Sequence, residues 1–176
     1  MMFRMEQIAS KCAEQIVKSF SLQPHPEGGW YRETYRSEDS IPQQALPERY
    51  SGSRSVSTCI YYLLTADTFS TMHLVQSDEI YHFYAGSPLE LLLLLPDGTS
   101  RVEIIGNDIG AGHHPQFVIH RGWWQGSRVK PGGEYTLIGA TVAPGFDFAD
   151  FSIGRREELL AKWPQAKDHI AQLTRE

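Results

Sequence analysis

Short β-type segments separated by turn-forming residues occupy the chain from about residue 54 to residue 142. Residues 57–64 and 89–95, for example, are rich in β-branched, aromatic and other apolar side chains, and Pro96-Asp97-Gly98-Thr99 turns the second segment into 101–105. No stretch between the segments has the length and 3.6-residue periodicity of a helix. Many short strands at this spacing are typical of a sandwich or a barrel.

Helices are expected only at the two ends of the chain. Within residues 5–20, apolar side chains recur every four residues opposite a charged face, as in an amphipathic helix. Two prolines and a glycine pair in residues 22–29 end this helix, and residues 37–53 are predicted to form a long surface excursion. We predict a single domain over 1–176, with a helix at about 5–20, a barrel at about 28–153 and a helical tail at about 155–174.

Charge and hydropathy exclude several classes of partner. The formal net charge of −5 argues against nucleic acid, because proteins that cover phosphates carry clustered Lys and Arg. The longest apolar run, Leu91 to Leu95, is far shorter than the roughly 20 residues of a membrane helix. Arg4, Glu6 and Lys11 interrupt any signal-peptide core at the N-terminus. We therefore expect a cytoplasmic protein with no membrane partner.

Residues 70–86 hold the densest group of side chains with acid-base or ligand chemistry, namely His73, Glu79 and His82. If the strand face that carries His73 lines a barrel, its imidazole and the Glu79 carboxylate converge on one cavity. The carboxylate would then fix the imidazole tautomer and raise its basicity, which suits a general base. A buried His–Glu pair without a function is the structural alternative. His82 is a third catalytic candidate, although strict alternation places it on the opposite face from Glu79 unless a bulge intervenes.

The chain is also rich in aromatic residues, and a minority of them would give a cavity the flat apolar walls of a small-molecule site. A tyrosine can in addition donate a proton. The candidate ligand-binding residues are Tyr31, Gln116, Trp123, Gln125, Phe146 and Phe148.

Two segments resemble the sequence motifs of the cupin superfamily. The first motif is a glycine, five residues, His-x-His, three or four residues, Glu, six residues and Gly; His73, Glu79 and Gly86 keep its spacing, while Val75 replaces the second His. The second motif, Pro-x-Gly-x-x-His, resembles residues 120–125, with Gln125 in the His position. Two of the four usual metal ligands are thus replaced, so no metal cofactor is expected.

Three longer segments, residues 24–35, 77–86 and 142–148, resemble the signature segments of one cupin subfamily. Its members are small stand-alone proteins, largely uncharacterised, that are often labelled predicted sugar epimerases. The resemblance implies a mainly β double-stranded β-helix, or jelly roll, with the pocket inside the barrel. It also implies a homodimer made by sheets that pair or pack across subunits.

The resemblance and the His–Glu pair together suggest a metal-independent epimerase or isomerase of a sugar-like compound. His73, supported by Glu79, would remove a proton next to a carbonyl group, and a tyrosine or His82 would return one. The ligand would be a small polar molecule, such as a sugar or a nucleotide-sugar. Two alternatives stay open: a metal-dependent cupin enzyme that holds a divalent metal through His73, Glu79 and Gln125, and a non-catalytic binding or storage-like module.

Overall fold

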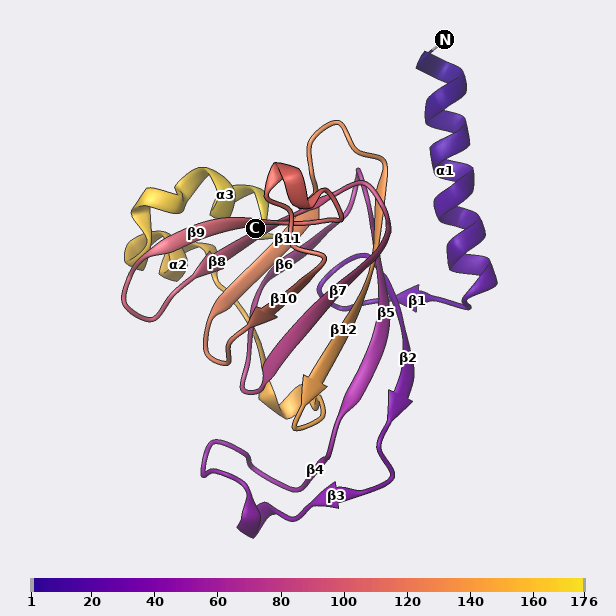
Figure 1. Ribbon diagram of the computed structural model, residues 1–176. Coiled ribbons are helices and arrows are strands. Elements are labelled where there is room, and N and C mark those ends of the chain that lie inside the picture. The colour runs from indigo at the N-terminus through magenta and orange to yellow at the C-terminus, as the bar shows by residue number, and fades with distance from the viewer. Residues whose placement is uncertain (1, 176) are drawn as a thin grey trace.

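Two antiparallel β-sheets lie against each other and hold most of the core between them (Figure 1). The computed structural model describes residues 2–175 of the chain, and side chains from residue 11 to residue 175. The six-stranded sheet consists, in order, of β1 (Gln23–Pro24), β2 (Trp30–Arg36), β5 (Thr58–Thr65), β12 (Tyr135–Ala143), β7 (Asp78–Gly86) and β10 (Gln116–Ile119). The five-stranded sheet consists of β13 (Phe151–Ile153), β6 (Phe69–Val75), β11 (Trp124–Val129), β8 (Leu89–Leu94) and β9 (Ser100–Ile105).

Helical segments are few and lie mostly towards the ends of the chain, as the sequence predicts. The α-helices are α1 (Met2–Ser19), α2 (Arg156–Lys162) and α3 (Lys167–Gln172). Short 3-10 turns are η1 (Gln43–Ala45), η2 (Ile109–Ala111), η3 (Phe148–Asp150) and η4 (Pro164–Ala166). Two antiparallel sheets with helices at the two ends confirm the mainly β fold class. Within residues 2–175, no helix is long and apolar enough to cross a membrane.

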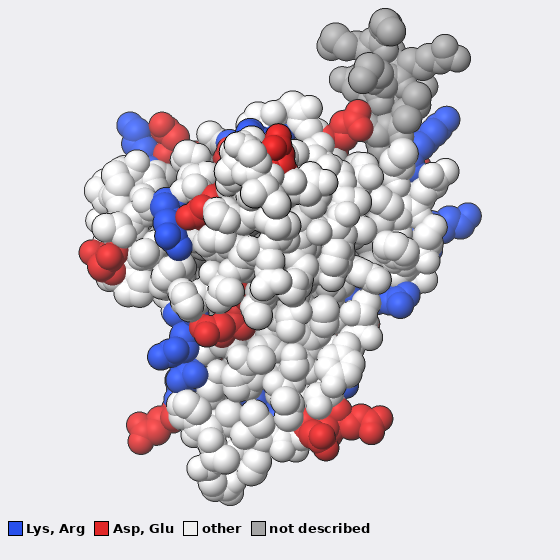
Figure 2. All heavy atoms as spheres, in the orientation of Figure 1, with Lys and Arg blue, Asp and Glu red and all other residues white. Residues whose placement is uncertain are grey.

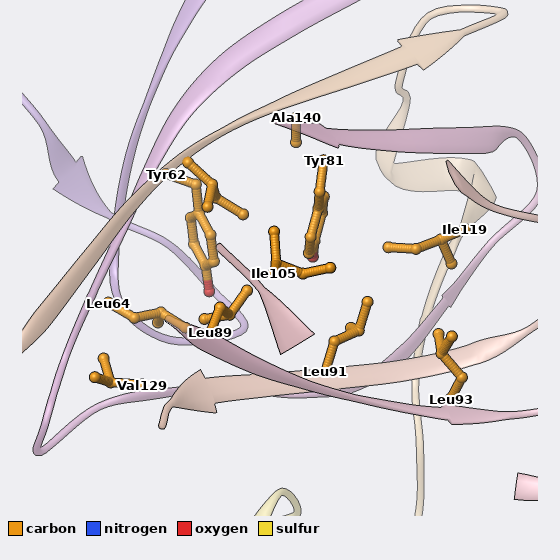
Figure 3. Packing of buried hydrophobic residues seen from close by; sticks show 11 residues of the cluster. Tyr62, Leu64, Tyr81, Leu89, Leu91, Leu93, Ile105, Ile119, Val129 and Ala140 are labelled. Carbon is orange, nitrogen blue, oxygen red and sulfur yellow. The ribbon is translucent and has the colours of Figure 1, made fainter. Parts of the chain in front are cut away.

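Strand β8 contributes to two cores because both of its faces are covered. Leu89 and Leu91 point towards Tyr62 and Tyr81 of the facing sheet, and Leu93 points towards Ile119 (Figure 3). The alternate residues of the strand, Leu92 and Leu94, pack under the C-terminal helices with Met72, Leu159, Trp163 and Ile170. This two-sided burial explains why residues 89–95 are apolar at nearly every position.

The C-terminal half of α1 packs against the end of the six-stranded sheet. Ala13 is buried in a cluster with Leu63 and Leu137, and Phe20, just after the helix, stacks on Tyr61 with ring centroids 4.9 Å apart. The first part of the predicted helix, residues 5–10, lies outside the residues whose side chains are described. The helix is thus anchored to the barrel through its last turns.

The long excursion over residues 37–53 contains strand β3 (Ser40–Ile41), which pairs with β4 (Arg54–Ser55). Tyr50 fastens it to the barrel: this side chain is 1% exposed, and its hydroxyl lies 2.9 Å from Ser77 Oγ. At the end of the excursion, the Arg54 guanidinium makes two hydrogen bonds to the Asp150 carboxylate, of 2.7 and 2.6 Å. The excursion is therefore fixed to the rest of the molecule by buried polar contacts.

Candidate functional site

A cavity of about 430 Å³ lies inside the barrel, and both sheets contribute to its wall. One part of the wall is aromatic and aliphatic, and the other carries acids, histidines and a single arginine. The described residues that line it are Gln23, His25, Glu27, Tyr31, Glu33, Arg36, Thr58, Ile60, His73, Val75, Glu79, Ala140, Val142, Phe146, Asp147, Phe148 and Phe151. Mixed walls of this kind are typical of small-molecule sites.

The turn between β1 and β2 carries the Glu27 carboxylate into this cavity. Gly28 has φ +119°, and a Cβ there would lie 2.1 Å from the carbonyl oxygen of Phe69, so the close approach requires glycine. The Tyr62 hydroxyl donates to the Gly28 carbonyl at 2.7 Å, and the Thr71 N–H donates to the Glu27 carbonyl at 2.9 Å. These contacts hold Glu27 at 6% exposure.

His73, on β6, has its tautomer set by two acceptors. Its Nδ1 lies 2.8 Å from the Thr71 carbonyl oxygen and 3.3 Å from Glu27 Oε2. Because a backbone carbonyl oxygen can only accept, Nδ1 carries the proton and the lone pair of the neutral ring is on Nε2. Within residues 11–175, no hydrogen bond engages Nε2. The ring is 2% exposed and lies 5.3 Å from the ring of Phe151.

Glu79, on β7 of the opposite sheet, is held by Gln125. Gln125 Nε2 donates to Glu79 Oε2 at 2.6 Å, and Gln125 is the partner of His73 in the register of β11 with β6. Burial raises the pKa of Glu79 to about 7, while His73 lowers it, Glu27 raises it and the Gln125 hydrogen bond lowers it. Near neutral pH this carboxyl group therefore exists in both protonation states.

His25 completes the polar wall as a neutral ring. Its Nδ1 accepts a hydrogen bond from the Glu27 backbone N–H at 3.3 Å, so that nitrogen carries no proton. Burial lowers the pKa of His25, against the raising effect of the Glu27 carboxylate. The 3.7 Å separation between His25 Nδ1 and Glu27 Oε1 is thus a contact with a neutral imidazole.

Arg36 and Glu33 form an ion pair at the edge of the cavity. The register of β2 with β5 shifts between Glu33 and Tyr35, which brings Arg36 to the cavity side and leaves Tyr35 55% exposed. Arg36 Nε and Nη2 donate to the two oxygens of Glu33 at 2.9 and 2.7 Å. Nη2 also donates to the Phe146 carbonyl, and Nη1 to Ser55 Oγ.

Of the predicted site residues, His73, Glu79, Tyr31, Phe146 and Phe148 line the cavity, and Gln125 lies directly behind Glu79. The nearest carboxylate to His73 Nδ1 is that of Glu27, where the sequence analysis expected Glu79. Glu27 was missed as a site residue, although a signal was present, since it stands directly before the glycine pair.

His82, Gln116 and Trp123 are not among the described residues that line the cavity. His82 Nε2 lies 3.1 Å from Thr141 Oγ1 on the outer side of the sheet. Strand β7 does carry a bulge, because its register with β12 shifts between Phe83 and Ala85. Both residues lie beyond His82, so the alternation of side chains from Glu79 to His82 is unbroken.

The other two predicted binding residues have contacts elsewhere. Gln116 is exposed and pairs with His82 in the register of β10 with β7. Trp123 lies edge to face with His120, with ring centroids 5.0 Å apart, and under the Arg101 guanidinium at 5.1 Å. Residues 37–53 likewise contribute no side chain to the described lining.

The sequence analysis left open a metal site at His73, Glu79 and Gln125. Among the side chains of residues 11–175, no group of three or more His, Cys, Asp or Glu is arranged to hold a metal ion. Gln125 turns its amide nitrogen, which is a donor and not a metal ligand, towards Glu79. The set His73, Glu79 and Gln125 contains only two residues of these four types, so metal binding by this set stays a prediction.

The chain matches one protein family over most of its length. The family described as "Cupin superfamily (DUF985)" matches residues 14–154. An uncharacterised protein of Saccharomyces cerevisiae is 31% identical over 155 residues, which cover 84% of this chain and 77% of that protein. None of these descriptions assigns a reaction, so the sugar epimerase label receives no support from them.

Two solved structures have the same fold over nearly their whole length. A hypothetical protein from Leishmania major is 32% identical, with a TM-score of 0.84 over 93% of this chain and 99% of that one. A protein from Shewanella oneidensis is 35% identical, with a TM-score of 0.82 over 93% of this chain and 97% of that one. The fold is thus shared with these two proteins over most of this chain.

Proposed function

We propose that this chain, which belongs to the DUF985 family of the cupin superfamily, binds a small polar molecule in its barrel, removes a proton from it and returns one to it. The observation that carries the proposal is that His73 and Glu79 both line one cavity. They come from different sheets, and each has a protein partner that sets its protonation or its position. Two such groups are what an epimerase or isomerase of a carbonyl compound needs.

His73 is the base of the proposed reaction. Its Nε2 takes a proton from a carbon next to a carbonyl group, and the C–H electron pair moves onto the carbonyl oxygen to form an enolate. The imidazolium that results carries its charge 3.3 Å from Glu27 Oε2, which stabilises it. Glu27 is thus a positioning residue: it orients the ring before the proton arrives and compensates its charge afterwards.

Glu79 is the acid, in the role that the sequence analysis left to a tyrosine or to His82. A carboxyl group with a pKa of about 7 is partly protonated at neutral pH, so it returns a proton to the carbon, or to the neighbouring one in an isomerisation. Because Glu79 belongs to the sheet opposite His73, it can deliver its proton to the substrate from a direction different from that in which His73 removes one. The products are an imidazolium and a carboxylate, which exchange protons with solvent.

Deuterium exchange tests the proposal without knowledge of the natural substrate. A panel of aldoses, ketoses, amino sugars and nucleotide-linked keto sugars in D₂O is followed by proton NMR at the carbon next to the carbonyl group. We expect exchange on at least one compound with the wild-type protein after treatment with a chelator, and its loss in His73→Gln and Glu79→Gln.

His82→Gln is the matched control, because His82 lies on the other face of the strand that carries Glu79 and its change should leave exchange intact. Exchange that survives in His73→Gln would overturn the proposal. A compound that binds to the wild-type protein but exchanges no proton would identify a non-catalytic binding module instead.

We also propose a homodimer. In the view of Figure 2, charged side chains lie mostly around the margin, and the middle is largely uncharged. The exposed side chains of the six-stranded sheet include Tyr35 (55%), Tyr84 (49%) and Val118 (38%). An exposed apolar region of a sheet supports contact with a second protein surface.

A further inference from the structure

We propose, building on the function proposed above, that the molecule bound in this cavity carries a positive charge, as a protonated amine does. The substrate class would then be an amine-bearing carbonyl compound, such as an amino sugar. A nucleotide-sugar, whose phosphates are negative, would be excluded. The inference follows from the charges of the lining, from the contacts of its one guanidinium and from its aromatic wall.

Acidic side chains outnumber basic ones in the cavity. Four carboxylates, those of Glu27, Glu33, Glu79 and Asp147, are among the described lining residues, against Arg36 as the one Lys or Arg. Glu33 is neutralised by its ion pair with Arg36. The carboxylates of Glu27 and Asp147, joined by that of Glu79 at a pH above its pKa of about 7, give the cavity a negative potential, which attracts cations and repels anions.

Arg36 cannot serve as an anion site while these contacts persist. A guanidinium has five N–H donors, and the Arg36 Nε and Nη2 groups are directed to Glu33 and the Phe146 carbonyl, with Nη1 on Ser55. At most about one N–H is left. Phosphate or carboxylate recognition by arginine normally uses two parallel N–H groups, which this side chain no longer has.

Glu27 and Glu79 are buried without a Lys or Arg partner among the described ion pairs. Their exposed fractions are 6% and 9%, and their polar neighbours include the imidazoles of His25 and His73, the amide of Gln125 and the Tyr62 hydroxyl. The nitrogen that His25 turns to Glu27 accepts a hydrogen bond, so that ring offers no positive charge. Buried carboxylates are costly unless a cation compensates them, and a ligand ammonium group would do so.

Three phenylalanine rings form an apolar part of the wall, and one of them, Phe151, lies next to the His73 ring. Phe146 and Phe148 have ring centroids 5.1 Å apart, and Phe151 lies 6.1 Å from each of them. Phe148 is 54% exposed, so solvent reaches this edge of the cavity. The faces of aromatic rings attract organic cations, which makes this wall and the carboxylates favour the same ligand charge.

A set of three probes with one ring and different charges tests the proposal. Benzylamine is a cation at pH about 8, benzyl alcohol is neutral and benzoate is an anion, and their dissociation constants are measured by titration calorimetry at low salt, where screening is weak. We expect benzylamine to bind at least about tenfold more tightly than benzyl alcohol, and benzoate to bind most weakly. Binding of benzoate as tight as that of benzylamine, or no binding of any probe, would overturn the proposal.

Two variants with the same change in net charge separate the cavity from the surface. Glu27→Gln should reduce the preference for benzylamine over benzyl alcohol by about fivefold or more. Glu157→Gln, on the exposed face of α2, should leave it unchanged. An equal reduction in both variants would show that the preference comes from the net charge of the protein.

The charge of the ligand and the proton transfer are measured separately. A preference for benzoate in a protein that still exchanges deuterium would overturn the ligand charge and leave the proposed function standing. A preference for benzylamine in a protein that exchanges no deuterium on any compound would overturn the proposed proton transfer and leave the ligand charge standing.

Discussion

Replacement of Glu79 by glutamine tests the electrostatic basis of the site. The pKa of Glu79 is raised from 4.5 to about 7, so between these values the folded protein holds a proton that the unfolded chain releases. Raising the pH through this interval therefore favours unfolding. At about 1.4 kcal/mol per pH unit, the interval from 4.5 to about 7 corresponds to about 3 kcal/mol.

Glu79→Gln removes this loss of stability because an amide does not ionise. The glutamine keeps an oxygen that can accept the hydrogen bond from Gln125 Nε2, so the packing of the site should change little. We expect the unfolding free energy of the variant, relative to that of the wild type, to rise by about 3 kcal/mol from pH about 4.5 to pH about 8.

Urea denaturation of both proteins across this pH range gives the difference directly, and other groups that titrate in both proteins cancel from it. Glu157→Gln, an exposed change of the same kind, should show no such trend. A difference between the Glu79→Gln and wild-type proteins that is constant with pH would refute the reasoning. It would mean that Glu79 ionises at its ordinary pKa and cannot supply an acid at neutral pH.

Three further predictions concern the framework around the site. Arg54→Ala should lower the free energy of unfolding, measured by urea denaturation, by about 3–5 kcal/mol because it leaves Asp150 buried and unpaired. The double change with Asp150→Ala should cost less than the two single losses together, and additive losses would contradict this. Gly98→Ala places a Cβ in open space at φ +88° and should lower the free energy of unfolding by about 1–2 kcal/mol. Gly28→Ala should lower it by more, because its Cβ would meet the Phe69 carbonyl. Equal shifts in melting temperature for the two variants would argue against that close approach. Native mass spectrometry should give the mass of a dimer, and a monomer at all concentrations would contradict the proposed assembly.

Much of the fold was predictable because its signals are local. The continuous apolar run 89–95 indicates a strand covered on both faces, and β8 is packed between the inner core and the C-terminal helices. The Pro-Asp-Gly-Thr turn then pairs β8 with β9, as predicted. The buried anchor Tyr50 was not predictable, since its partner Ser77 is remote in the chain.

The candidate site was predictable in part, for the same reason. His73 and Glu79 were recognised from their spacing, and both line the cavity. His82 was included because a bulge would have brought it to the same face, and the bulge of β7 lies beyond it. The position of a bulge depends on how neighbouring strands pair, which a single strand does not encode.

By itself, the sequence determined the mainly β architecture, the helical ends and the strand face shared by His73 and Val75, because alternation and turn chemistry act between residues close in the chain. Only the tertiary structure decided that Glu27 contacts His73 and that Glu79 is buried against Gln125. Those contacts require a glycine turn to dock on another strand and two sheets to close over each other. The ionisation of a carboxyl group depends on the dielectric and the charges around it, and these exist only when distant segments have come together.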